Sequence, residues 1–287
     1  MRKLLMIGIV VLFCGCAQKQ PKNYTPDVLN RMTPIKNQGK SQTCWIYAML
    51  AAIETEQLSM GDSVNLSPYY IEKKMEQEPQ CPETKRGMGK TLLNLIKKYG
   101  IVDYDAMQNV ETSPPKYVSL AGVEYSVKEF ARSVCKPDEY IALTSNDDEP
   151  YYRNIDIDLP DNWMHDRFYN IPIDSLLAKT IRAVRQHHGV CWESKSHAMA
   201  IVGIAHDGEG NPYFIMKNSW GTKRAHQGLE YLSFRKFREQ TLAVEMTKEA
   251  YDNRASVRIV SSKLLCYHIC FPKFCRLDIS LYLCTFK

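Results

Sequence analysis

The chain has 287 residues, of which 45% are hydrophobic and 24% charged, as in an ordinary soluble globular protein of one or two domains. Its formal net charge of +5 comes largely from the ends: Arg2 and Lys3 lie at the start, and seven Lys or Arg against three Asp or Glu follow residue 245. The rest of the chain is close to neutral, so the sequence excludes a basic surface for nucleic acid.

Residues 1–16 have the pattern of a secretory leader. Two basic residues precede an apolar run over residues 4–13, which is too short for a transmembrane helix. The stretch Phe13-Cys14-Gly15-Cys16 resembles a bacterial lipobox. This resemblance implies that Cys16 is lipidated and that the protein is exported to the bacterial cell envelope on a lipid anchor, with a plain signal peptide as the alternative. The polar residues 17–30 are then a tether.

The first half of the chain is predicted to be mostly helical. A turn-forming segment leads into an Ala-rich helix over residues 43–58. A second helix begins with Ser67 at its N-cap and Pro68 in its first turn. A third, amphipathic helix covers residues 91–99 and stops at Gly100.

The second half is richer in strand patterns. A helix over residues 173–186 precedes the strongest hairpin pattern, in which residues 197–204 and 213–218 flank a turn rich in Asp, Gly and Asn. Further strands are predicted at residues 140–144 and 190–192. A helical half followed by a sheet-rich half predicts an α+β fold with a cleft between the two parts.

Cys44 lies in the first turn of the Ala-rich helix. There the unsatisfied N–H groups and the positive end of the helix dipole favour a thiolate. Gln38, six residues upstream, carries an amide that can donate to an oxyanion beside the sulfur. This helix start therefore predicts a nucleophile in need of a base.

The predicted hairpin supplies that base. His197 opens its first strand and Asn218 ends its second, so the two side chains are expected to face each other. An Asn carbonyl that accepts from one imidazole nitrogen sets the tautomer and directs the other nitrogen towards the thiol. Trp220 is predicted to shield this hydrogen bond from water.

Three sequence blocks together resemble the signatures of the papain-like cysteine peptidases. They are Pro34-Ile35-Lys36-Asn37-Gln38-Gly39 with Thr43-Cys44-Trp45, then Ser196-His197-Ala198-Met199, then Lys217-Asn218-Ser219-Trp220-Gly221. The resemblance implies a two-lobed peptidase domain over residues 31–245, with a helical lobe to residue 115 and a sheet lobe from 116 to 245. It also implies a glycine loop in which Gly87 and Gly89 help to bind the substrate.

Within the family, the chain is most similar to the bleomycin hydrolase and bacterial aminopeptidase C branch. Ser41 stands where papain has a disulfide-forming cysteine, and Gln42 replaces a residue that is usually small. The implied function is a thiol peptidase that acts on peptides or proteins through Cys44, His197 and Asn218 without a cofactor.

Two other functions stay open. One is a surface lipoprotein that binds peptides or partners without turnover, and the other is a cell-wall Cys–His endopeptidase of the NlpC/P60 type. No metal site is expected, because the histidines lack partners at ligand spacing and Cys81, Cys135 and Cys191 are interpreted as structural thiols. The Cys-rich basic tail, residues 246–287, has no assigned role.

Overall fold

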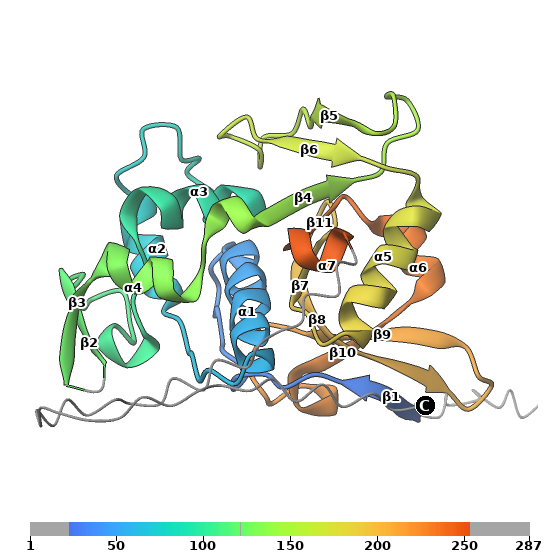
Figure 1. The fold of residues 1–287 in the computed structure, drawn as a ribbon, viewed down its shortest axis with the longest axis horizontal. Helices are drawn as coiled ribbons and strands as arrows, with labels where there is room; N and C mark the ends of the chain where they lie inside the picture. The colour runs from blue at the N-terminus through green and yellow to red at the C-terminus, as the bar shows by residue number, and fades with distance from the viewer. Residues whose placement is uncertain (1–22, 121, 253–287) are drawn as a thin grey trace, which may run out of the picture. The chain divides into compact units, whose positions relative to one another are not determined.

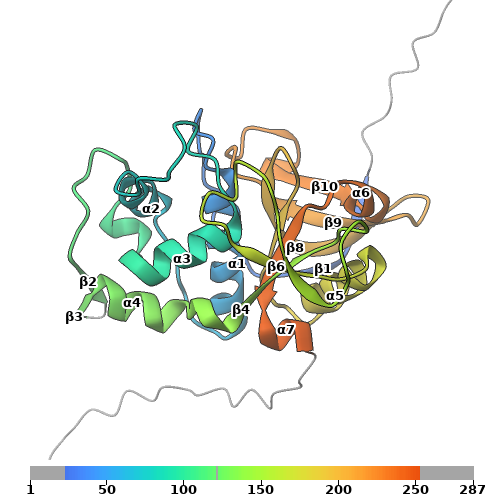
Figure 2. The same ribbon diagram turned by 90° about the horizontal axis from the view of Figure 1, so that it is seen from above.

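A computed structural model describes residues 23–120 and 122–252 of the protein (Figure 1). Within this part of the chain, helices α1 to α4 gather on one side and the main sheet lies on the other, as Figures 1 and 2 show. The fold is α+β with a mostly antiparallel sheet, as the sequence predicted.

The helices agree with the sequence prediction within a few residues where one was predicted. Ser67 caps its helix as expected, since its hydroxyl oxygen accepts from the backbone N–H of Tyr70 at 3.3 Å. Bounds of the α-helices are α1 (Cys44–Ser59), α2 (Pro68–Met75), α3 (Gly89–Tyr99), α4 (Val127–Val134), α5 (Ile173–Arg185), α6 (Phe234–Gln240) and α7 (Lys248–Asp252). Single 3-10 turns are η1 (Tyr104–Ala106), η2 (Pro137–Glu139) and η3 (Ala225–Gly228).

The main sheet has nine strands in the described residues, in the order β10-β9-β8-β7-β11-β4-β6-β5, with β1 beside β8. Only β4 and β6 run parallel. Its strands are β1 (Tyr24–Leu29), β4 (Tyr140–Thr144), β5 (Arg153–Asp156), β6 (Arg167–Asn170), β7 (Val190–Glu193), β8 (Ala198–Asp207), β9 (Pro212–Lys217), β10 (Leu229–Ser233) and β11 (Ala243–Thr247). A separate hairpin joins β2 (Tyr117–Leu120) to β3 (Val123–Ser126).

Helix α1 is buried on all sides, which suits its Ala-rich sequence. Every residue from Trp45 to Leu58 is buried, between helices α2 and α3 and strands β7 and β8. The approach of β7 is very close: a Cβ on Gly189 would lie 1.8 Å from the carbonyl oxygen of Ala52. Glycine before β7 therefore lets the sheet lie directly against the helix.

A buried carboxylate, Glu54 in the middle of α1, joins segments from both halves of the chain. It accepts from Lys36 Nζ at 2.6 Å and from the backbone N–H of Leu66 at 2.7 Å, and it also accepts from the Thr33 hydroxyl. Lys217 Nζ, at the end of β9, donates to Thr33 at 2.6 Å and lies 3.7 Å from Glu54. One negative charge thus faces two positive ones, and its hydrogen bonds make burial tolerable.

The predicted domain boundaries need three corrections. Strand β1 falls in the predicted tether 17–30, yet it pairs with β8; Pro26 is tolerated because β1 has a single neighbour and is bulged after Pro26. The helical lobe extends past residue 115, since α4 contributes Phe130 and Val134 to the core around α1. The fold also continues past residue 245, because β11 runs to Thr247 and α7 follows it.

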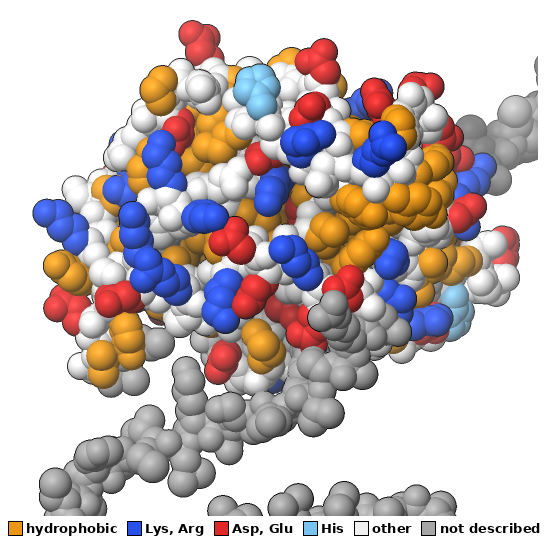
Figure 3. Space-filling model, turned by 45° about the horizontal axis from the view of Figure 1, so that its top comes forward, with side chains coloured by type: hydrophobic (Ala, Val, Ile, Leu, Met, Phe, Trp, Pro, Cys, Tyr) orange, Lys and Arg blue, Asp and Glu red, His pale blue; other side chains and the backbone are white. Residues whose placement is uncertain are grey.

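The predicted leader at 1–16 and the cysteines of the tail beyond residue 252 lie outside the described residues. Within the described part of the chain, no helix combines the length and the apolar character needed to cross a bilayer. On the face shown in Figure 3, acidic and basic side chains alternate without a large area of one sign.

The Glu54 cluster makes a prediction about stability. Replacing Glu54 with Gln keeps the shape but leaves Lys36 and Lys217 without their counter-charge, so we expect the free energy of unfolding to fall by about 3 kcal/mol. Urea denaturation followed by fluorescence measures the loss. The matched control is Glu239→Gln, which removes an exposed partner of Arg235 and should cost less than about 1 kcal/mol. Equal losses in the two variants would contradict the central role of Glu54.

Candidate active site

Cys44 is the first residue of α1, and no side chain caps the N-terminus of this helix. The N-cap residue, Thr43, makes no side-chain cap; its hydroxyl donates instead to Glu72 Oε1 at 2.6 Å. The N–H of Ile46 donates to the Thr43 carbonyl at 2.9 Å. The N–H groups of Cys44 and Trp45 have no capping side chain and can face an anion at the sulfur.

Burial works against ionisation of the thiol. It raises the pKa of Cys44, and the charge of Glu193 adds to this, while backbone hydrogen bonds from Ala198 and Trp45 and the charge of Arg86 lower it. The pKa remains above its usual value, so the helix start by itself does not produce the thiolate expected from the sequence. A positive partner is needed to hold the thiolate.

His197 lies in the tight turn between β7 and β8, where Ser194 Oγ accepts from its backbone N–H at 3.1 Å. Its Nε2 is 2.9 Å from Asn218 Oδ1, which is the contact expected from the hairpin. An Asn oxygen can only accept, so Nε2 carries a proton and Nδ1 is left to exchange a proton with the thiol. Burial lowers the pKa of His197, while Asn218 and the charge of Glu230 raise it.

Trp220 covers the imidazole, as the sequence suggested. Its ring stacks on His197 with the centroids 4.6 Å apart and the planes 21° from parallel. The guanidinium carbon of Arg224 lies over the Trp220 ring, 4.3 Å from its centroid. Since the ring excludes water from the His197 side, the hydrogen bond to Asn218 is stronger than it would be in solvent.

Gln38 is attached to the segment that carries Asn218. Its backbone N–H donates to the carbonyl of Ser219 at 2.8 Å, and the Ser219 hydroxyl donates to its side-chain oxygen. That second contact turns the amide nitrogen away from Ser219, and one N–H donates to the Ser41 carbonyl at 2.6 Å. The nitrogen has a second hydrogen, which is the one available for an oxyanion.

Glu230, in β10, is a site residue that the sequence analysis missed. Its Oε1 accepts from Asn218 Nδ2 at 2.5 Å, so the amide is gripped at both ends and its oxygen must face His197. No sequence signal marks it: β10 pairs with β9 through Glu230 opposite Met216, and only this register brings it beneath Asn218. Glu230 therefore lies behind Asn218 and fixes the orientation of its amide towards His197.

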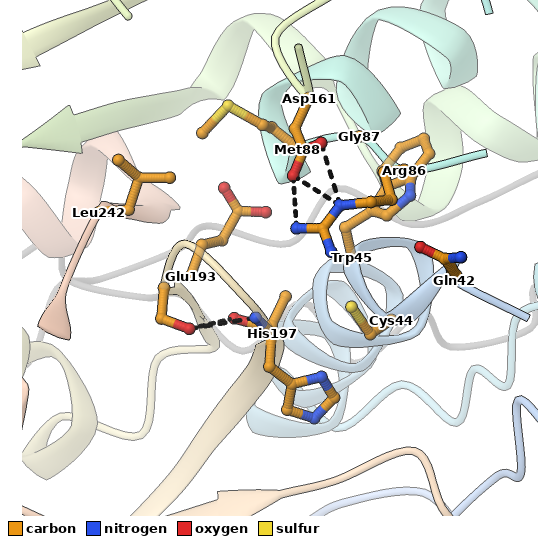
Figure 4. A pocket seen from close by; sticks show the side chains of 12 residues that line it. Gln42, Cys44, Trp45, Arg86, Gly87, Met88, Asp161, Glu193, His197 and Leu242 are labelled. Carbon is orange, nitrogen blue, oxygen red and sulfur yellow. Dashed lines mark hydrogen bonds and ion pairs between the residues drawn. The ribbon is translucent and has the colours of Figure 1, made fainter. Parts of the chain in front are cut away.

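Cys44 and His197 line one pocket, shown in Figure 4. On one wall the Arg86 guanidinium is paired with Asp161, with the shortest N–O distance 2.7 Å. The backbone of this wall is held by two indoles, since Trp45 Nε1 donates to Lys85 O at 3.1 Å and Trp163 Nε1 donates to Arg86 O at 3.0 Å. The pocket combines residues of both lobes, which is the cleft expected from the sequence.

The remaining predicted site residues lie as follows. Gly87 lines the pocket, and a Cβ there would come within 2.7 Å of the Trp45 ring, so glycine is required by close contact. Gln42 is exposed at the pocket edge. Gly89 differs from the prediction: its N–H donates to Glu193 Oε1 at 2.7 Å and is thereby unavailable to a substrate.

The model of the papain family of cysteine proteases matches residues 22–251. The chain belongs to this family. Among its relatives are a senescence-specific cysteine protease of Arabidopsis thaliana, 26% identical over 69% of this chain and 52% of its own length, and a viral cathepsin of Choristoneura fumiferana defective polyhedrosis virus, 26% identical over 76% and 61%. The chain thus spans about half the length of the curated relatives it matches.

The fold of the papain family is also seen in the solved structure of PepW from Lactobacillus rhamnosis. The TM-score is 0.61 at 15% sequence identity, over 79% of this chain and 82% of that one. This similarity concerns the fold alone.

The contact between Asn218 and Glu230 predicts how thiol reactivity depends on pH. Glu230→Gln keeps an oxygen for Asn218 but removes the charge that raises the pKa of His197. The imidazolium then loses its proton at lower pH, so less thiolate–imidazolium pair exists near neutrality. We expect alkylation by iodoacetamide to slow several-fold near pH 6–7 and to match the parent above pH about 10, where the thiol ionises without a partner.

The control is Glu209→Gln, which removes an exposed carboxylate at the turn between β8 and β9. Its alkylation profile should follow the parent. A Glu230→Gln profile that is merely scaled down at every pH would indicate a structural role and would contradict the positioning of His197 through Asn218.

Proposed function

We propose that the chain is a thiol peptidase that hydrolyses peptide bonds through an acyl-enzyme formed on Cys44. Membership of the papain family supports this class of activity. The observation that carries it for this chain is the oriented base: His197 is held by Asn218 at 2.9 Å, covered by Trp220 and directed into the pocket that contains Cys44.

Acylation begins when the proton of the Cys44 thiol moves to His197 Nδ1. Burial makes either charge costly alone, and the two charges appear together so that each compensates the other. The thiolate attacks the carbonyl carbon of the peptide. The oxyanion then accepts from the free N–H of Gln38 and from the first-turn N–H of Cys44.

Collapse of this intermediate breaks the C–N bond, and the imidazolium of His197 gives its proton to the leaving amine. A water molecule next loses a proton to His197 and attacks the thioester carbonyl. The C–S bond breaks, the acid is released and the sulfur regains its proton. Asn218 keeps the ring in the same plane through all four proton transfers.

A second function, peptide binding without turnover, has one observation in its favour. Burial raises the pKa of the Cys44 thiol and lowers that of the His197 imidazole, which favours the neutral pair in the resting site. The cell-wall endopeptidase alternative belongs to a different group of Cys–His hydrolases, and the match to the papain family disfavours it.

Labelling with an epoxysuccinyl probe tests the nucleophile. We expect the parent to be labelled and to cleave members of a peptide library, and Cys44→Ala to do neither. His197→Ala should lose at least about 100-fold in labelling rate, because it removes the base. Cys81→Ala, which deletes another partly accessible thiol, should behave as the parent.

Labelling that persists in Cys44→Ala would disprove the assignment of the nucleophile. Labelling of the parent without cleavage of any library member would instead favour the binding function.

The hydrogen bond from Ser219 to Gln38 predicts that substitutions of these two residues have non-additive effects on kcat. Gln38→Ala removes an oxyanion donor and should lower kcat about 100-fold with little change in KM. Ser219→Ala leaves the amide free to rotate, and we expect a fall of about tenfold. In the double variant the effects should not add, since Ser219 acts through Gln38. Additive losses would show that Ser219 has another role.

We also propose that the protein is exported and held in the bacterial cell envelope by a lipid on Cys16. The support is the lipobox-like sequence alone, which lies outside the described residues. Cys16→Ser should move the protein from the membrane to the soluble fraction, and Cys14→Ser should leave it membrane-bound. Membrane association unchanged in Cys16→Ser would rule out this anchor.

A further inference from the structure

Two carboxyl groups and one thiol, those of Glu193, Glu245 and Cys191, meet on one face of the sheet. In the antiparallel pair β7–β11, Glu245 lies directly opposite Cys191, and Glu193 lies two residues along β7 from Cys191. Side chains two residues apart on a strand share a face, and so do directly opposed residues. One ligand atom from each residue lies within 4.8 Å of the other two, and the exposed fractions are only 3% for Glu193 and 0% for the others.

The carboxylates of this cluster are not satisfied by protein groups. Glu193 Oε1 accepts from the N–H of Gly89, but Glu193 Oε2 and both oxygens of Glu245 meet no N–H or O–H donor from another described residue. The thiol of Cys191, a weak donor, is the group that interacts with the Glu245 carboxyl. The positive charge of Lys90, at the start of α3, acts on Glu245, and Asp166 adds a negative one. Buried carboxylates without partners are costly, and proteins usually pair them or bind them to a metal.

We propose that Cys191, Glu193 and Glu245 bind one thiophilic divalent cation of the Zn²⁺ type. A thiolate with two carboxylates suits Zn²⁺ and disfavours Ca²⁺ and Mg²⁺, which take more ligands and only oxygen. Bond lengths of about 2.0–2.3 Å require the ligand atoms to close to roughly 3.5 Å, a movement of about 1 Å. Three protein ligands leave one coordination position for water or a substrate group.

The surroundings favour this arrangement. The N–H of Gly89 holds one oxygen of Glu193, leaving Oε2 as the free ligand atom, as second partners of metal-bound carboxylates do. Gly89 also leaves room: a Cβ there would lie 2.8 Å from Glu245 Oε2 and 3.3 Å from Cys191 Sγ. Glu193 lines the pocket of Cys44 (Figure 4), so one ligand of the proposed cation belongs to the wall of that pocket.

This proposal replaces two expectations from the sequence, that Cys191 is a structural thiol and that no metal is bound. Residues 191 and 193 are separated from 245 by about fifty positions without ligand spacing. Only the pairing of β7 with β11 brings them together.

The test uses the full chain carrying Cys44→Ala, because Cys44 and His197 could themselves bind Zn²⁺. After treatment with EDTA, the protein is titrated with Zn²⁺ by calorimetry, and bound zinc is measured after desalting. We expect about one Zn²⁺ per chain and a rise in melting temperature. Adding Glu245→Gln or Cys191→Ser should weaken binding at least tenfold and abolish the rise, and adding Cys135→Ser, another buried thiol, should change neither.

Co²⁺ supplies a second readout that needs only the folded Cys44→Ala parent. Coordination by Cys191 should give a sulfur-to-cobalt charge-transfer band, and Cys191→Ser or Glu193→Gln should remove or weaken it. A folded parent that binds no Zn²⁺ and shows no such band overturns the proposal and indicates that the carboxyl groups hold only protons. Binding that survives Cys191→Ser together with Glu245→Gln overturns it as well.

Discussion

The carboxylate of Glu54 ties together the three stretches of chain that meet at the candidate site. It lies on the helix that begins with Cys44, and it holds Lys36, two residues before Gln38, and Lys217, one residue before Asn218. A buried ion pair of this kind stabilises little compared with apolar packing, but it is costly to break and it tolerates few arrangements. The cluster therefore sets the positions of Cys44, Gln38 and Asn218 relative to one another.

Burial of Cys44 and His197 opposes the ionisation that their reactivity requires. Burial raises the pKa of Cys44 and lowers that of His197, so neither charge is stable alone. Two oriented dipoles favour the charged forms. The uncapped start of α1 lies beside the sulfur, and the Asn218 amide is fixed between His197 and Glu230. The Asn218 amide lies between the Glu230 carboxylate and the imidazole. From there the negative charge favours the imidazolium but does not accept its proton.

The buried carboxyl groups of Glu54 and Glu245 have different surroundings. Glu54 faces two ammonium groups and several donors, whereas the Glu245 carboxyl meets only the weak thiol donor of Cys191 among the side chains of the described residues. Both are fully buried, so the difference lies in their partners and not in their exposure. That contrast is the physical basis for placing a cation beside Glu245 and for treating Glu54 as structural.

The sequence by itself determined the α+β class, the approximate positions of helices α1, α2, α3 and α5, and the blocks around Gln38, Cys44, His197 and Asn218, because caps, periodicity and short motifs are local. It did not predict the short helices α4, α6 and α7. It did not reveal the strand at residues 24–29, where proline hides an edge strand, or the true limits of the lobes. Only the tertiary structure decided that Glu230 supports Asn218 and that Glu245 faces Cys191. Those contacts depend on strand register, which is set by long-range packing and leaves no local pattern.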